Sequence, residues 1–400
     1  MDINQKSLCL HEKNKGKLAT RSKIEIKNFD DLSLVYTPGV AEPCRKINQN
    51  NNDVYKYTMK SNTVAVITNG TAVLGLGDIG PKAAIPVMEG KSILFKEFAG
   101  INSFPICIDS KDSQEIINIV SKISSVFGAI NLEDIKAPEC FEIEEKLKQK
   151  LDIPVFHDDQ HGTAIVVSAG IINSLKIVNK KLEESEALIV GAGSAGISIA
   201  KMLISLKIKN VVLYDKKGVI YKDFDWLNKE QQKISLITNL HQEKSNLINV
   251  FKNKDIVIGV AGPNIITKEM ISNMNKDSIV FSLANPVPEI MPHEAKKAGA
   301  RIIATGRSDF PNQINNVLVF PGIFKGALEA KATEINNDMK IASVYALSNI
   351  ISDKELNENN IIPTVFDKRV VIEISKAVIE AAIKTNVVRK NYYEPEKLDQ

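Results

Sequence analysis

Cysteine is scarce in this sequence, and no hydrophobic run is long enough to cross a bilayer. The four cysteines are scattered over 400 residues without a C-x-x-C pair. That distribution is typical of a reducing compartment and argues against a disulfide framework or a zinc–thiolate site. No apolar run approaches the roughly 18 residues of a membrane span, and the polar start of the chain lacks the apolar stretch of a signal peptide. We therefore expect a cytoplasmic protein without a membrane partner.

The sequence also lacks an excess of charge of one sign. The 51 lysines and arginines nearly balance the 48 aspartates and glutamates, and the net charge is +3. No dense basic stripe is present, so a nucleic-acid partner is not expected and a small-molecule ligand is favoured. Hydrophobic residues make up 44% of the chain, which is enough for the cores of two or three domains.

Short apolar segments alternate with helical patterns from about residue 60 onward, whereas the polar segment before them is expected to be irregular or helical. Buried strands separated by helices predict an α/β fold with parallel sheets covered on both faces. The expected strands are 63–68, 105–109, 127–134, 153–156, 187–190, 211–214, 255–260 and 278–283, and the expected helices are 162–175, 197–208 and one near the C-terminus with Val371, Ile374, Val378 and Ala381 on its apolar face.

The pattern changes between about residues 150 and 160, and we place a domain boundary there. We predict an N-terminal α/β domain for substrate and metal over 1–155 and a doubly wound Rossmann-type domain for the dinucleotide over 156–385. Residues 386–400 would form a C-terminal tail.

A glycine-rich turn between an expected strand and an expected helix indicates dinucleotide binding. The segment 191–196 matches G-x-G-x-x-G, and Asp215 ends the next strand, where a ribose hydroxyl would be held. The alternative is a plain strand-to-helix turn. Asp215 favours NAD, but Lys216 and Lys217 could receive the 2′-phosphate of NADP. The loop residues are Gly191, Ala192, Gly193, Ser194, Ala195 and Gly196.

A second G-x-G-x-x-G motif contains Gly75, Gly77 and Gly80. No acidic residue ends a following strand at the expected distance, so this match is weaker. The loop is either a structural turn or a second wall of the cofactor cleft.

Two pairs of acidic residues follow expected strands: Glu133 with Asp134, and Asp158 with Asp159. Ligands of open α/β sheets bind beyond the carboxyl ends of strands, where clustered carboxylates suit Mg²⁺ or Mn²⁺. The alternative for any single acid is a helix cap or a solvated loop. His157 and His161 flank the second pair, but His157 is expected in a strand, so the helical spacing of a zinc site should fail.

Five motifs in the same order resemble those of the malic enzyme family, over about residues 15 to 385. They are SLVYTPGVA (33–41), GLGDIG (75–80), FHDDQHGTA (156–164), SLANPVPE (282–289) and SDFPNQINN (308–316). The chain is most similar to the short bacterial branch. The resemblance implies oxidative decarboxylation of (S)-malate to pyruvate and CO₂, reduction of NAD or NADP, a requirement for Mg²⁺ or Mn²⁺, and a homodimer.

The family motifs also imply a role for individual residues. Tyr36 would be the general acid and Lys91 the general base, with Asp158 as an auxiliary acid. We expect burial near a cation to lower the pKa of Lys91 toward neutrality. The remaining assignments are metal ligands at Glu133, Asp134 and Asp159, malate contacts at Asn285 and Asn316 with Asn315 as the alternative to Asn316, and a cofactor contact at Asn285.

One position departs from the family pattern. Longer relatives carry an arginine for the substrate carboxylate where this chain has Ala72, so the group that binds this carboxylate stays open. Two other classes therefore remain as alternatives. One is a metal-independent two-domain dehydrogenase for another 2-hydroxy or amino acid, and the other is a non-catalytic dinucleotide sensor.

Overall fold

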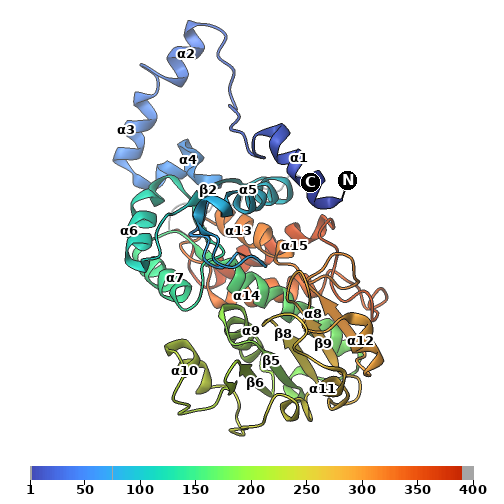
Figure 1. Ribbon diagram of the computed structural model, residues 1–400. Helices are drawn as coiled ribbons and strands as arrows, with labels where there is room; N and C mark the ends of the chain where they lie inside the picture. The colour runs from blue at the N-terminus through green and yellow to red at the C-terminus, as the bar shows by residue number, and fades with distance from the viewer. Residues whose placement is uncertain (1, 74, 390–400) are drawn as a thin grey trace.

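The computed structural model describes residues 2–73 and 75–389 and contains one parallel and one mainly parallel sheet, one above the other in the view of Figure 1. The upper sheet has the strand order β2-β1-β3-β4, and the lower sheet has the order β10-β9-β8-β5-β6-β7. Short β-branched strands with helical connections produce this architecture, as the sequence pattern predicts. The expected two-sheet α/β fold is thereby confirmed.

Helices cover the upper sheet on both faces. Its strands are β1 (Thr63–Thr68), β2 (Asn102–Cys107), β3 (Ala129–Leu132) and β4 (Val155–His157). On one face, Val64 and Val66 share a core with Met88 and Phe95 of α5 (Gly80–Ala99). On the other face, the sheet packs on α6 (Ser113–Ile123) and α7 (Glu139–Lys150).

The lower sheet is doubly wound around the glycine-rich turn 191–196. Its strands are β5 (Glu186–Val190), β6 (Asn210–Asp215), β7 (Gly218–Val219), β8 (Ile256–Gly259), β9 (Ile279–Ser282) and β10 (Ile302–Thr305), and all neighbours pair in parallel except β6 with β7. One face packs on α8 (Thr163–Ile177) and α9 (Ser194–Ser205). Helices α10 (Lys229–Ser235), α11 (Lys268–Ser272) and α12 (Pro292–Lys297) complete this part.

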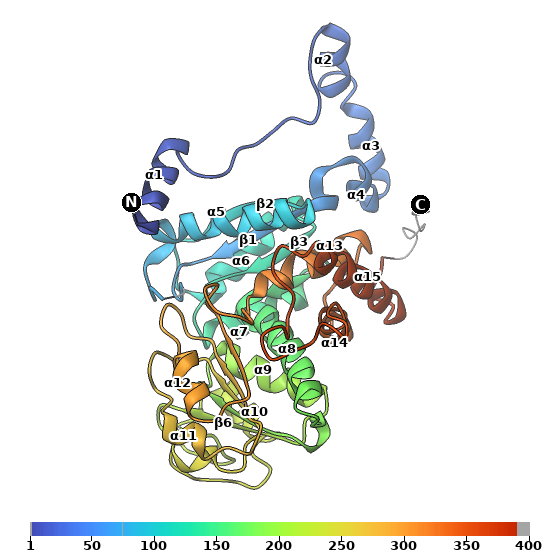
Figure 2. The same ribbon diagram turned by 90° about the vertical axis from the view of Figure 1, so that its right-hand side faces the viewer.

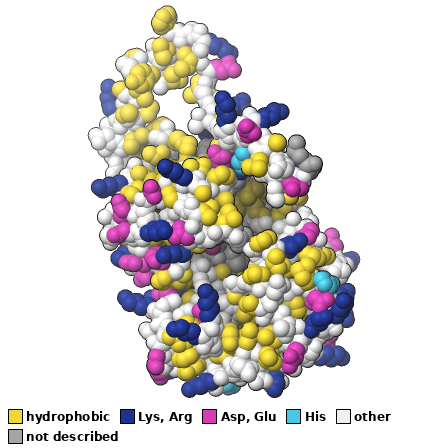
Figure 3. Space-filling view, in the orientation of Figure 1, with side chains coloured by type: hydrophobic (Ala, Val, Ile, Leu, Met, Phe, Trp, Pro, Cys, Tyr) yellow, Lys and Arg dark blue, Asp and Glu magenta, His cyan; other side chains and the backbone are white. Residues whose placement is uncertain are grey.

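The last three helices join the two sheets. They are α13 (Phe320–Glu329), α14 (Asn337–Ser348) and α15 (Arg369–Lys384). A single hydrophobic cluster contains Val66 of the upper sheet, Ile258 of the lower sheet, and Phe324 and Ile374 of these helices. The two layers therefore share a core, and the space-filling view shows the surface hollowed between the upper and lower parts (Figure 3).

The N-terminal helices are α1 (Ile3–Asn14), α2 (Phe29–Val35), α3 (Ala41–Gln49) and α4 (Val54–Tyr57). Helices α2 and α3 form an arm that projects from this body, whereas α1 and α4 lie against the upper layer (Figures 1 and 2). None of the residues of α1, α2 and α3 is buried, although Phe29 and Leu34 are large and apolar. An exposed apolar arm of this kind is typical of a surface that meets another chain.

Most expected elements lie where the pattern placed them, and β1 has the predicted bounds. Strand β10 was not predicted. The expected boundary at 155/156 lies inside β4, which pairs with β3 of the upper sheet. Of the expected tail, residues 390–400 lie outside the described part of the chain. Among the described residues, no helix combines the length and apolar character needed to cross a membrane.

Candidate functional site

Adjacent strands of the upper sheet bring the two pairs of acidic residues together. Strand β3 pairs in parallel with β4, so Glu133 and Asp134 emerge beside Asp158 and Asp159. Glu133, Asp134 and Asp159 each offer a carboxylate oxygen, and these oxygens lie within 4.8 Å of one another. The Asp134 amide donates a hydrogen bond of 2.8 Å to Asp159 Oδ2, which holds the two segments in register.

Lys91 reaches this carboxylate cluster from the middle of α5. Its Nζ lies 2.9 Å from Glu133 Oε1 and also donates to Asp158 Oδ2. The side chain is only 8% exposed, and its Nζ lies 4.1 Å from the centre of the Phe320 ring. Lys91 is thus a buried cation, held by two carboxylates and one aromatic face.

Burial and mutual repulsion dominate the electrostatics of the acidic residues. Burial, followed by the neighbouring charges of Asp159 and Glu133, raises the pKa of Asp134 to about 9. Burial raises the pKa of Asp158 to about 8, although Lys91 opposes this shift. Burial also raises the pKa values of Glu133 and Asp159. The surrounding protein therefore does not fully stabilise the ionised form of these carboxylates, and the protonated form is favoured.

This donor set fits a hard divalent cation. The three carboxylates are the oxygen ligands that Mg²⁺ and Mn²⁺ prefer, and their raised pKa values show that a cation would relieve their repulsion. Two buried oxygens, Asp158 Oδ1 and Asn131 Oδ1, have no hydrogen-bond partner among the described residues. Glu133, Asp134 and Asp159 are therefore the residues that could hold the ion.

The pKa of Lys91 differs from the expected direction. Burial by itself lowers it, but the carboxylates of Asp158 and Glu133 outweigh burial and raise the pKa above the ordinary lysine value. The protein's own groups therefore shift this pKa upward, because two anions adjoin the ammonium group, and the expected lowering by a nearby cation stays a prediction.

The structure separates the roles of the two candidate asparagines. Asn316 Nδ2 donates to Asp158 Oδ2, the same oxygen that binds Lys91. Asn315 turns away, and its side chain accepts from the Val317 amide at the start of the short helix η7 (Asn316–Leu318). Asn316 is therefore the one of this pair that lies at the carboxylate cluster.

Tyr36 is not brought to this cluster within the chain. It follows α2 on the projecting arm and is 68% exposed (Figure 2). Lys91, by contrast, lies inside the body of the molecule. A single chain thus presents the proposed base without the proposed acid.

The loop 191–196 has the geometry of a dinucleotide site. It joins β5 to α9, and Gly191 adopts a φ of +114°, where a Cβ would also lie 2.7 Å from Val260 O. A Cβ at Gly193 would meet no atom within 4 Å, so this position is open to a ligand. Asp215 Oδ2 accepts 2.7 Å from Gln231 Nε2, which also donates to Ala192 O. Gln231 therefore ties the acid to the glycine loop.

The first glycine loop meets the lower sheet near Asn285. Gly75, Gly77 and Gly80 all have positive φ values, and the amides of Gly77 and Gly80 donate to carbonyls within the same loop. A Cβ at Gly75 would lie 3.4 Å from Asn285 O. The loop is thus an internally bonded turn that also borders Asn285.

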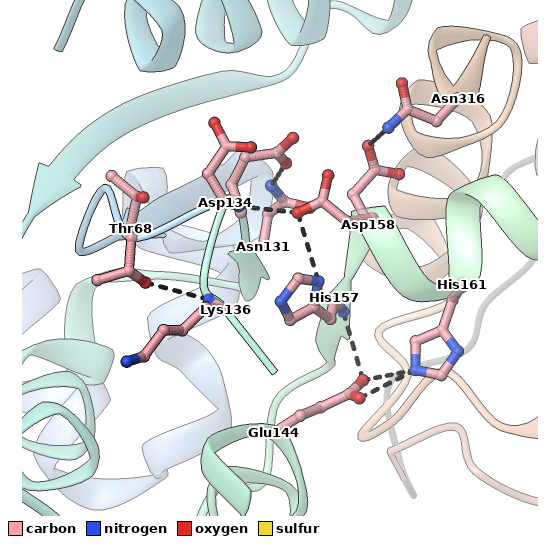
Figure 4. A network of polar contacts seen from close by, with 12 residues as sticks. Thr68, Asn131, Asp134, Lys136, Glu144, His157, Asp158, His161 and Asn316 are labelled. Carbon is pink, nitrogen blue, oxygen red and sulfur yellow. Dashed lines mark hydrogen bonds and ion pairs between the residues drawn. The ribbon is translucent and has the colours of Figure 1, made fainter. Parts of the chain in front are cut away.

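Sequence analysis missed Glu144, which links the acidic cluster to the start of α8. Glu144 Oε1 accepts from the His157 amide at 3.3 Å and lies 2.8 Å from His161 Nε2 (Figure 4). The two histidines thus share a carboxylate and do not join the metal-ligating group. Zinc binding through this pair is not supported. Glu144 lies mid-helix in α7, so only the tertiary fold reveals its role.

Comparisons with known proteins agree with this site. A family model described as "Malic enzyme, N-terminal domain" matches residues 13–148, and one described as "Malic enzyme, NAD binding domain" matches residues 160–384. The bifunctional malic/malolactic enzyme of Bacillus subtilis is 51% identical over 97% of this chain and 95% of its own. The NAD-dependent malic enzyme of Geobacillus stearothermophilus is 54% identical over 94% of this chain and 78% of its own.

A solved structure extends the agreement to three dimensions. The malic enzyme from Pyrococcus horikoshii superposes with a TM-score of 0.93 at 45% identity, covering 97% of this chain and 92% of its own. The fold and the site define a two-domain, nicotinamide-dependent oxidoreductase. The chain belongs to the malic enzyme family, and it catalyses the oxidative decarboxylation of malate with NAD or NADP. The dinucleotide-sensor and metal-independent alternatives are set aside.

Proposed function

We propose that Lys91 is the general base that accepts the proton of the malate C2 hydroxyl. The observation that supports this role is the buried Lys91 Nζ held between Glu133 and Asp158. Asn316 donates to the same Asp158 oxygen, so Asp158 and Asn316 position the ammonium group. A divalent cation held by Glu133, Asp134 and Asp159 would polarise the C2 oxygen of malate and stabilise the enolate that forms when CO₂ leaves.

The cation also bears on the proton affinity of Lys91. Glu133 raises the pKa of Lys91, and it is a proposed metal ligand as well. A cation on Glu133 would reduce the effect of one negative partner of Lys91 and would lower the pKa of the lysine. Lys91 would then be neutral at a lower pH and could accept the hydroxyl proton.

Tyr36 acts as the acid in the site of a second copy of the chain, within a homodimer. This proposal rests on the exposed arm that carries Tyr36 and on the apolar residues beside it, among them Phe29 and Leu34. A C₂ dimer would exchange the arms symmetrically, so that each site receives one tyrosine. Tyr36 would then protonate C3 of the enolate to yield pyruvate.

Asp215, Asn285 and the loop 191–196 bind the dinucleotide, with NAD preferred over NADP. The Asp215 carboxylate suits a ribose hydroxyl and repels a 2′-phosphate. Asn285 also contacts malate. The site binds the substrate carboxylate without the arginine that longer relatives carry at the position of Ala72. The chain divides into domains at 1–155 and 156–385, and the enzyme acts in the cytoplasm.

The experiment is a nicotinamide reduction assay with purified protein, (S)-malate and Mn²⁺. NAD and NADP are compared, each with and without a chelator, and pyruvate and lactate are quantified. We expect pyruvate in a one-to-one ratio with reduced nucleotide, loss of activity with chelator, and a faster rate with NAD. Folded, metal-loaded protein that reduces neither nucleotide would refute the assignment, and a faster rate with NADP would refute the stated preference.

A further inference from the structure

A cavity outside the acidic cluster lies between the two layers. It has a volume of about 400 Å³, within the range of small-ligand pockets. Helix α7 of the upper layer, helices α9 and α10 of the lower layer and the joining helix α14 contribute its walls, and these helices are neighbours in Figure 1. Its lining includes neither the glycine loop nor Asp215, Lys91 or any of the three proposed metal ligands.

Cations outnumber anions around this cavity. Its lining holds four lysines, Lys148, Lys201, Lys233 and Lys340, against three glutamates, Glu144, Glu145 and Glu230. Glu230 is shared by Lys201 at 3.3 Å and Lys233 at 2.6 Å. Glu144 is shared by Lys148 at 2.6 Å and His161 at 2.8 Å.

Lys340 is the cation left without an acidic partner. Its Nζ lies 3.1 Å from His161 Nδ1, and it forms no ion pair within residues 2–73 and 75–389. Burial, with the positive charge of Lys148 next in importance, lowers the pKa of Lys340 to about 7. Burial and the positive charge of Lys148 therefore disfavour the ammonium form of Lys340, and a bound anion would favour that form.

A buried amide provides an independent sign of a missing ligand. Gln160 lines the cavity and is only 2% exposed, yet its Nε2 has no hydrogen-bond partner among the described residues. An unsatisfied buried donor costs about 1–3 kcal/mol, so such a group usually has a partner when its site is filled. A carboxylate or phosphate oxygen would accept this hydrogen bond.

We propose that this cavity binds a small anion that carries carboxylate or phosphate groups, held by Lys340, Lys201 and the Gln160 amide. The cavity volume suits a dicarboxylate or a phosphate monoester better than a nucleotide. Lys201 comes from α9, Lys340 from α14, and Gln160 from the turn η4 (Asp158–Gly162), so the anion would connect three separate elements.

The bound anion alters the proposed metal site through η4 and Glu144. Asp158 and Asp159 form one end of this π-helical turn, and Gln160 and His161 form the other. Figure 4 shows Glu144 beside His157 and His161, on the side away from Asn316. An anion that attracts Lys148 weakens the ion pair between Lys148 and Glu144, which also accepts from the His157 amide. Anion binding and metal binding are therefore coupled, in both directions.

Isothermal titration calorimetry of the full chain tests the binding with two probes, succinate and inorganic phosphate. Each probe is titrated to about 10 mM, the range of weak binding, with and without saturating malate and Mn²⁺. We expect at least one probe to bind at one site, with malate present as well as absent. The probe that binds more tightly identifies the carboxylate or the phosphate source. Absence of saturable binding by both probes, or complete displacement by malate, would overturn the proposal.

Variants distinguish the cavity from other anion-binding surfaces. K340Q and K201Q should each weaken binding at least about tenfold, as expected when a charged partner is lost. K181Q is the matched control, because Lys181 is an exposed lysine that pairs with Glu184 outside the cavity. Lys201 is itself 46% exposed, so K201Q tests the site even if K340Q fails to fold. Unchanged affinity in folded K201Q and K340Q would place the probe elsewhere and overturn the proposal.

A separate measurement tests the coupling between the anion cavity and the proposed metal site. At saturating probe, the Mn²⁺ concentration for half-maximal activity should change by about fivefold or more in the wild type, within the usual range of coupling, and stay constant in K340Q. A probe that binds through Lys340 without changing the Mn²⁺ response would overturn the coupling between the two sites.

Discussion

The Nζ atom of Lys91 lies 2.9 Å from the Oε1 atom of Glu133, and Glu133 also belongs to the carboxylate group that could hold a divalent cation. The same glutamate therefore serves the proposed base and the proposed metal. Because a cation on Glu133 would weaken its hold on the proton of Lys91, we expect the lysine to be a more effective base when the metal is bound.

Replacing Lys91 by alanine should abolish most of the turnover. General base catalysis contributes about 10²- to 10⁴-fold, so we expect kcat to fall within that range in K91A. Stopped-flow or steady-state absorbance of the reduced nicotinamide measures the loss. K96A is the matched control, because Lys96 lies on the same helix and points to Asn102 at the surface. Near-wild-type activity in folded K91A would contradict the assignment.

Two inactive variants should complement each other if the active site is shared. We expect Y36F and K91A homodimers each to be nearly inactive. When the two are mixed and allowed to exchange subunits, the mixed dimer regains one complete site, and about a quarter of the wild-type activity returns at a one-to-one ratio. Activity is measured against time after mixing. Failure of activity to return, with exchange verified by mass spectrometry, would place Tyr36 in the site of its own chain.

The metal-free protein should lose stability as pH rises. The pKa of Asp134 is raised to about 9 and that of Asp158 to about 8 in the folded chain, from an ordinary value of 3.8. The folded state therefore holds protons that the unfolded state has released. The contribution of these groups to stability is full below the ordinary value of 3.8, declines as pH rises above it, and is lost once pH passes about 8 to 9. Thermal unfolding of chelator-treated protein between about pH 6 and pH 9 measures this decline.

Mn²⁺ should bind more tightly at higher pH in the same interval, because the ion displaces protons from these carboxylates. Titration calorimetry at several pH values measures the affinity. D134N should show a weaker dependence on pH as well as lower affinity. An affinity that is constant from about pH 6 to pH 9 would show that the carboxylates are already ionised in the metal-free protein.

Asp215 should determine how strongly the enzyme prefers NAD over NADP. In D215A, loss of the ribose contact should raise KM for NAD about tenfold, as for a lost charge-assisted hydrogen bond, while KM for NADP falls or stays level. Steady-state kinetics with both nucleotides provide the measurement. Q231A is a companion variant, because Gln231 holds Asp215 at 2.7 Å without belonging to the glycine loop. Equal effects of D215A on both nucleotides would show that Asp215 does not discriminate between them.

The local parts of the site were predictable from the sequence. A strand, the loop 191–196, a helix and Asp215 follow one another within a single βαβ unit, so their order along the chain determines their geometry. The pairs of acidic residues were predictable in the same way, since each follows a strand. The direction of the Lys91 pKa was not, because it depends on carboxylates from β3 and from η4.

Contacts between residues that are far apart in the sequence could be identified only from the structure. Lys91 and Asp158 are 67 positions apart, and Asp158 and Asn316 are 158 positions apart. The family resemblance indicated these residues but not the hydrogen bonds between them, and it left Asn315 and Asn316 as alternatives. The side-chain hydrogen bonds distinguish them, because Asn315 caps its own helix while Asn316 faces Asp158.

The sequence by itself determined the α/β class, the dinucleotide loop, the family motifs and the residue types of the metal site, because these are recorded in local patterns of spacing and alternation. Only the tertiary structure decided that Glu144 links both histidines, that Lys340 borders a cavity and forms no ion pair with the described residues, and that Tyr36 lies on an arm outside the body of its own chain. The physical reason is that ion pairs, burial and cavities arise where separate segments pack, and the electrostatic potential at each group depends on all the segments around it.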